Sequence, residues 1–219
     1  MSRLYRQLLV TLVIPILAWS INVPAQSPSK ADPLKPYTTC KLPGDLKIKE
    51  VSRRPKGENC RYVKTGKGRE KVSVADGYRV MFAYSDVLYY FANVKIEQSD
   101  PASYLEDKAK VIDELKYDSS TKQATGIVYM DKTMLNGFEH YGIDRDKIDV
   151  GGQVGIHVLF YDRVHLIITI YILNQDDKNI LRSQYGYRRF INIEQYNTLK
   201  DDFLNRYSAC LKDITAAQP

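Results

Sequence analysis

The chain has 219 residues, of which 44% are hydrophobic and 26% are charged, and its formal net charge is +6. This composition is close to the globular average, which excludes a wholly disordered chain, a coiled coil and a collagen. The length suits one domain with a sizeable core. With three His, three Cys and no Cys-x-x-Cys spacing, we expect neither a metal nor a cofactor.

The first 25 residues have the organisation of a secretory signal peptide. Arg3 and Arg6 precede an apolar stretch at residues 8–21, and Val23 and Ala25 stand at the −3 and −1 positions of a cleavage site. The apolar stretch is shorter than the roughly 20 residues of a membrane-spanning helix, which favours cleavage over retention as an anchor. We therefore expect an exported protein, periplasmic or secreted, with no transmembrane span after cleavage before Gln26.

Most of the positive charge belongs to one section of the chain. Residues 26–39 are rich in Pro, Ser and Lys and predict a flexible leader. Residues 40–75 form a basic, Cys-containing extension, which we expect to lie outside a core domain at 76–214. Between residues 45 and 71, ten basic residues stand against four acidic ones. The candidate anion-binding residues are Lys47, Lys49, Arg53, Arg54, Lys56, Arg61, Lys64, Lys67, Arg69 and Lys71.

A basic section indicates an acidic partner. Export favours an anionic glycan, a lipid surface or an acidic protein, and argues against nucleic acid. The alternative is that the section is only a solvated extension held by a disulfide.

The three Cys differ in their surroundings. Cys40 and Cys60 bracket a stretch rich in Gly, Pro and Lys, and an oxidising compartment favours a disulfide between them. Cys210 recurs with apolar residues at helical spacing, which predicts a buried free thiol. Intermolecular pairing and a catalytic thiol are the alternatives for these residues.

Strand and helix signals follow in chain order. Strand-like segments lie near 46–51 and 61–64. Asp76-Gly77, between apolar runs, is typical of a tight hairpin before strands at 78–84 and 88–97. A helix is predicted from about 100 to 116, with Asp100 as its N-cap and Leu105 on its apolar side. Strands are then predicted at 125–130 and 134–141.

Residues 154–173 predict a central hairpin. A three-residue turn at 161–163 would pair Phe160 with Val164 and place His157 and His165 on one face. Both faces are apolar, so a terminal helix from about 193 to 212 is expected to cover one of them. Together the elements predict an α+β fold, an antiparallel sheet of successive hairpins with two main helices packed on it.

From Asp76 to Leu211 this layout resembles the PsbP-like family of small exported α+β proteins. The residues that carry the resemblance are the strand at 90–96, the helix from Asp100, and the strand at 165–171 before Phe203-Leu204. The resemblance implies a binding or accessory role rather than catalysis. It supplies no functional residue that can be matched to this chain.

We therefore expect a non-enzymatic binding or accessory domain. One alternative is a hydrolase that uses Glu139 with His140, or the pair His157 and His165. Another is attachment to an anionic surface through residues 41–71. A calcium loop formed by Asp144, Asp146 and Asp149 is not supported, because Ile148 occupies the third ligand position and the central Gly is missing.

Overall fold

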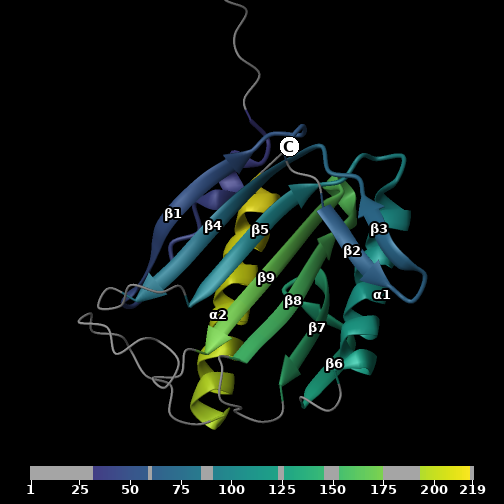
Figure 1. Cartoon of the computed structure of the whole chain (residues 1–219). Helices are drawn as coiled ribbons and strands as arrows, with labels where there is room; N and C mark the ends of the chain where they lie inside the picture. The colour runs from purple at the N-terminus through teal and green to yellow at the C-terminus, as the bar shows by residue number, and fades with distance from the viewer. Residues whose placement is uncertain are drawn as a thin grey trace, which may run out of the picture. The chain divides into compact units, whose positions relative to one another are not determined.

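The computed structural model describes residues 32–58, 61–84, 91–122, 126–145, 153–174 and 193–217 (Figure 1). Seven antiparallel strands form one sheet in the order β1-β4-β5-β9-β8-β7-β6, and β2 and β3 form a separate hairpin. The strands are β1 (Leu46–Arg54), β2 (Arg61–Thr65), β3 (Gly68–Val72), β4 (Asp76–Tyr84), β5 (Ala92–Gln98), β6 (Ile127–Leu135), β7 (Phe138–Arg145), β8 (Gln153–Tyr161) and β9 (Leu166–Asn174). The main helices are α1 (Tyr104–Thr121) and α2 (Ile193–Ala216), with short 3-10 turns η1 (Lys35–Thr38) and η3 (Asp162–Val164). The predicted α+β class is confirmed.

The two faces of the sheet bury separate apolar clusters. On the face that we call the α2 face, Phe82 and Leu159 pack with Phe203 and Tyr207 of α2, and the rings of Phe82 and Phe203 lie 5.3 Å apart. On the opposite face, the α1 face, Val158 joins a cluster that includes residues of α1 and the β2–β3 hairpin. Neighbouring residues of a strand point to opposite faces, so a strand that is covered on both sides is apolar throughout. Figure 1 shows α2 on one side of the sheet and the β2–β3 hairpin with α1 on the other.

The register of the β8–β9 hairpin differs from the prediction. Phe160 pairs with Ile167, not with Val164, because η3 and His165 form a longer connection. His165 adopts the left-handed conformation, with φ of 56°. The shift by an odd number of residues exchanges the faces of β9 relative to β8. Since both faces of the hairpin are apolar, hydrophobic alternation did not distinguish the two registers.

Helix α1 begins after a turn at residues 101–103, with Ser103 as its N-cap, so the predicted cap at Asp100 is wrong. Leu105 is 74% exposed, and the buried stripe contains Asp107. The Asp107 carboxylate accepts hydrogen bonds from the Ser99 hydroxyl and from the Ser73 amide at 3.1 Å. A carboxylate with enough donors can occupy a core position, which an apolar pattern does not reveal.

The hairpin predicted at Asp76-Gly77 is also absent from the described ranges. These residues begin β4, which pairs with β1 and β5. β3 ends at Val72 and pairs with β2 instead.

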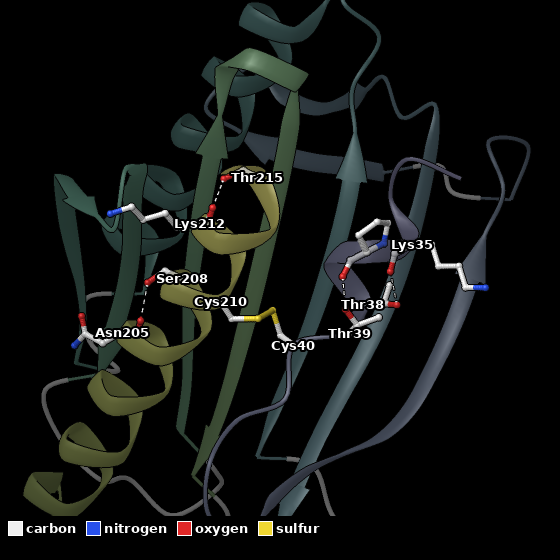
Figure 2. The surroundings of a disulfide bond; sticks show 10 residues. Lys35, Thr38, Thr39, Cys40, Asn205, Ser208, Cys210, Lys212 and Thr215 are labelled. Atoms are coloured by element: carbon white, nitrogen blue, oxygen red, sulfur yellow. Dashed lines mark hydrogen bonds between the residues drawn. A yellow bond between two sulfur atoms is a disulfide. The ribbon is translucent and has the colours of Figure 1, made fainter. Parts of the chain in front are cut away.

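The disulfide joins Cys40 to Cys210, with a Cα–Cα distance of 5.9 Å (Figure 2). The predicted Cys40–Cys60 bond and the free Cys210 thiol are therefore wrong; Cys60 itself lies outside the described residues. Cys40 lies two residues after the end of η1, in which the Thr38 hydroxyl donates to the Lys35 carbonyl at 2.8 Å. The bond thus fastens the start of the described chain to the terminal helix.

The basic section is part of the sheet. β1 pairs along its length with β4, and residues from Asp32 onward form one compact unit. Leu34 and Tyr37, at the end of the predicted flexible leader, are buried against the α2-face cluster. The expectation of an extension outside the core is therefore wrong. β1 belongs to the main sheet, but it is an edge strand whose side chains are mostly polar and exposed, so its sequence resembles that of a solvated segment. Residues 1–31, with the predicted signal peptide, lie outside the described residues.

None of the helices described here combines the length and the apolarity that crossing a membrane requires.

Candidate anion-binding pocket

A polar pocket of about 250 Å³ lies on the α1 face. Strands β1, β2, β3, β5 and β9 and helix α1 all contribute to its walls. The residues that line it are Arg54, Arg61, Tyr62, Arg69, Lys95, Glu97, Glu114 and Tyr171. Four cations against two carboxylates give the lining a net formal charge of +2.

The Arg61 side chain is held in place by hydrogen bonds and ion pairs with neighbouring side chains. Its Nη1 atom donates to Glu97 Oε2 at 2.8 Å and to Thr169 Oγ1 at 2.7 Å, and its Nη2 atom lies 3.9 Å from Glu114 Oε2. The side chains of Arg61 and Glu97 are only 10% and 5% exposed. Burial opposes the charge on Arg61, but Glu97, Tyr171 and Glu114 outweigh it and raise the pKa of the guanidinium. Arg61 is therefore a fixed, permanently charged group.

Glu114 is the second carboxylate of the pocket. Burial raises the pKa of Glu114, against the lowering effects of Arg61 and of the Lys64 amide that donates to it at 3.4 Å. A raised pKa weakens the negative charge that this side chain presents as the pH falls. The balance of charge in the pocket therefore favours an anion.

Two tyrosine rings stand beside cations at the pocket. The Arg69 guanidinium lies 4.7 Å from the centre of the Tyr62 ring, and Lys95 Nζ lies 5.0 Å from that of Tyr171. Each ring attracts a cation through its negative face and so orients it. Within the described residues, Arg54, Arg69 and Lys95 form no ion pair with a carboxylate. None of the three is therefore held in a close ion pair there, although Lys95 is near enough to Glu114 to favour the charged form of that carboxyl.

Three of the ten predicted anion-binding residues, Arg54, Arg61 and Arg69, meet in this pocket. Others are used elsewhere. Arg53 lies 3.5 Å from both Asp32 and Asp76, and Lys56 lies 3.4 Å from Asp100. Lys47 donates to the Gly44 carbonyl at 2.7 Å and lines a different, mainly apolar pocket. The remaining predicted residues, Lys49, Lys64, Lys67 and Lys71, do not line the polar pocket.

Sequence reasoning missed Tyr62, Lys95, Glu97, Glu114 and Tyr171. A partial signal existed in β5, where Asn93, Lys95 and Glu97 alternate with buried apolar residues and so share one face. Nothing in the sequence showed that the β2–β3 hairpin would stand over that face.

A second polar cluster, the histidine chain, runs from the exposed Thr133 to buried residues on the α2 face. Thr133 Oγ1 lies 2.9 Å from His140 Nδ1, and His140 Nε2 lies 3.0 Å from His157 Nδ1. His157 Nε2 lies 3.4 Å from Asp144 Oδ1, and the Lys200 ammonium of α2 donates to the other carboxylate oxygen. No residue of the histidine chain lines the polar pocket or the mainly apolar pocket at Lys47.

The environment of the histidine chain sets its charges. Burial, together with the neighbouring His157, lowers the pKa of His140 to about 4. Burial alone would raise the pKa of Asp144, but His157 and Lys200 outweigh it and lower that pKa. At neutral pH the cluster therefore holds a neutral His140 beside an ion pair, an arrangement that connects β7, β8 and α2.

Neither of the two residue pairs predicted for a hydrolase, Glu139 with His140 and His157 with His165, comes together in the structure. Glu139 points to the α1 face, where Lys108 binds it at 3.0 Å, whereas His140 points to the α2 face. The His165 ring contacts Tyr104 of α1, 5.1 Å between centres, and so lies on the face opposite His157. The two histidines that do meet are His140 and His157, which the sequence did not pair.

No set of three or more His, Cys, Asp or Glu in the described ranges is arranged to hold a metal ion. Of the three Asp residues of the calcium-loop hypothesis, Asp144 is paired with Lys200, and Asp146 and Asp149 lie outside the described residues.

Comparison of the chain with protein-family models, with curated proteins and with solved structures found no match. The resemblance to the PsbP-like family remains a prediction from the layout of the elements.

Proposed function

We propose that this protein is a non-enzymatic binding domain that holds a small anion in the polar pocket. The observation that supports this most is the gathering of Arg54, Arg69 and Lys95 at one cavity, none of them in a close ion pair within the described residues. Arg61 adds a cation that is already neutralised by Glu97 and Glu114. A ligand anion would supply a close counter-charge for Arg54, Arg69 and Lys95.

Arginine suits this role because its planar guanidinium donates two parallel hydrogen bonds to a carboxylate, sulfate or phosphate. Arg69 is already oriented by Tyr62 and Lys95 by Tyr171, so less side-chain entropy is lost on binding. The pocket is thus partly preorganised for an anion.

A binding function is favoured over hydrolysis because the histidines that could act as a general base are buried away from the pocket. A general base must lie within reach of a substrate proton, and His140 and His157 are 5% and 0% exposed. The lowered pKa of His140 also makes it a weak base at neutral pH. The histidine chain is better suited to holding α2 on the sheet.

Attachment to an anionic surface through residues 41–71 is the second candidate. Deleting these residues is not a usable test, because they include β1 and the β2–β3 hairpin. Single charge substitutions are required instead.

The test is isothermal titration calorimetry of the folded chain with sulfate and with phosphate. Arg69→Gln and Lys95→Gln should each weaken binding by at least fivefold, because each removes a cation that faces the pocket. Lys67→Gln, in the turn of the same hairpin but outside the pocket, is the matched control and should bind as the wild type does. Equal losses in all three variants would indicate general surface attraction, and no binding by the wild type would overturn the proposal.

Export is the second part of the proposal. The Cys40–Cys210 bond supports it, since disulfides persist mainly in oxidising compartments. N-terminal sequencing of the protein recovered from a secreting host should begin at Gln26. Recovery of only the full-length chain from the cytoplasm would contradict export.

A further inference from the structure

We propose that the anion in the polar pocket is carried by a single sugar ring, a uronic acid or a sulfated monosaccharide unit. This inference rests on the proposed function and names the ligand class for the same site. It is argued from the size of the pocket and from the residues in it that a bare anion does not need.

The volume of the pocket suits a ligand of about one ring. The cavity of about 250 Å³ is smaller than the roughly 300–1,000 Å³ of sites that enclose drug-sized ligands. A sulfate or phosphate ion alone would leave much of it empty, whereas a nucleotide, with its base, ribose and phosphate, would exceed it. A charged monosaccharide, or the end unit of an anionic glycan, is the intermediate size.

The carboxylates support a ligand with hydroxyl groups. Glu114 repels a bare anion, yet it lines the pocket with its side chain 28% exposed. A carboxylate accepts hydrogen bonds from hydroxyl groups, and such charge-assisted bonds are strong. A sugar presents hydroxyls to Glu114 while its acidic substituent faces Arg69, Arg54 and Lys95.

The tyrosines support a ligand with a weakly polar face. Tyr62 lines the pocket and is 47% exposed, so that a part of its ring not covered by the Arg69 guanidinium is open to a ligand. The face of an aromatic ring carries partial negative charge, which suits the polarised C–H groups on one face of a pyranose. Tyr62 and Tyr171 thus complete a site with an anion end, a hydroxyl end and an apolar wall.

The test is a titration of the folded chain with five probes: glucuronate, glucose 6-sulfate, glucose, sulfate and adenosine monophosphate. Glucuronate and glucose 6-sulfate should bind at least tenfold more tightly than sulfate, and neutral glucose should not bind measurably. Tyr62→Ala and Glu114→Ala should each remove this tenfold advantage of the charged sugars over sulfate. Sulfate itself should bind to Glu114→Ala at least as tightly as to the wild type, because the carboxylate that repels a bare anion is gone. Lys67→Gln, again the control, should change none of these affinities.

The possible outcomes separate the two proposals. If sulfate binds as tightly as the charged sugars, the sugar inference is overturned and the proposed anion site stands. Tighter binding of adenosine monophosphate than of both charged sugars would also overturn the sugar inference. If no probe binds, both proposals fall.

Discussion

Gly155 makes room for the most crowded polar contact on the α2 face. A Cβ atom at this position would lie 2.6 Å from Asp144 Oδ1, 2.8 Å from the Tyr196 hydroxyl oxygen and 3.2 Å from His157 Nε2. These groups are buried between the sheet and α2 and cannot move aside without disturbing the Lys200–Asp144 ion pair. The glycine is therefore required by close approach rather than by its backbone dihedrals.

We accordingly expect Gly155→Ala to lower the free energy of unfolding by about 1–3 kcal/mol, the usual cost of overpacking a core. Gly66→Ala is the matched control, because a Cβ at Gly66 meets no atom within 4 Å. Urea denaturation of both variants measures the difference. Equal stability of the two would contradict the packing described around Gly155.

The second prediction at this scale concerns pH. Burial lowers the pKa of His140 to about 4, below its ordinary value of 6.5, so the unfolded state binds the proton more readily than the folded state does. Stability from neutral His140 is full above about pH 6.5 and is lost as the pH falls toward 4. The loss amounts to at most about 3 kcal/mol.

Urea denaturation between pH 7.5 and pH 4 should show this decline for the wild type and a shallower one for His140→Asn. His165→Asn, which keeps both buried histidines and places Asn in a left-handed position that it tolerates, should decline as the wild type does. A slope that is unchanged in His140→Asn would assign the decline to other groups.

At the scale of elements, the disulfide connects two distant parts of the chain, not the two nearby cysteines that the sequence suggested. Cys40 and Cys210 are 170 residues apart in sequence, and on the chain-entropy model closing such a loop stabilises the folded state by about 5 kcal/mol. The bond holds η1 against α2, where Leu34 and Tyr37 are buried.

The variant with Cys40→Ser and Cys210→Ser should therefore lose up to about 5 kcal/mol of unfolding free energy, as should the reduced wild type. Cys60→Ser keeps the bond and should retain the wild-type stability. Urea denaturation with and without a reductant, with peptide mapping under non-reducing conditions, measures both points. A Cys40–Cys60 cross-linked peptide would refute the pairing.

Individual elements also show what the sequence could predict. Helix α2 was predictable because its apolar residues recur at helical spacing and its burial follows that stripe. The turn at Asn136-Gly137, with φ of 50° and 94°, was predictable from a strong hairpin dipeptide, although residues 134–141 were assigned to one strand. The partner of Cys40 was not predictable, because spacing in the sequence favours the nearer cysteine. The register of β8–β9 was not predictable either, because a hairpin that is apolar on both faces permits either register.

At the scale of the whole molecule, the basic section has two roles. β1 is an edge strand, and charged side chains such as Lys47 and Lys49 oppose pairing with a second chain there. This accounts for part of the positive charge without any ligand. Only Arg54, Arg61 and Arg69 remain as contributors to the pocket.

The pocket itself is a product of the tertiary fold. Its lining comes from five strands and one helix, and residues from Arg54 to Tyr171 meet across it. Composition indicated an anion-binding section but not the carboxylates, the two tyrosines or Lys95 of the pocket, since their meeting depends on where the β2–β3 hairpin lies over the sheet.

The most direct test of the anion site is anomalous diffraction from crystals soaked in selenate, a heavier equivalent of sulfate. We expect an anomalous peak in the polar pocket, within hydrogen-bond distance of Arg69 and of at least one of Arg54 and Lys95. The Arg69→Gln variant, soaked in the same way, should show the peak weakened or gone. Selenate found only at other basic residues, with the pocket empty in the wild type, would contradict the account.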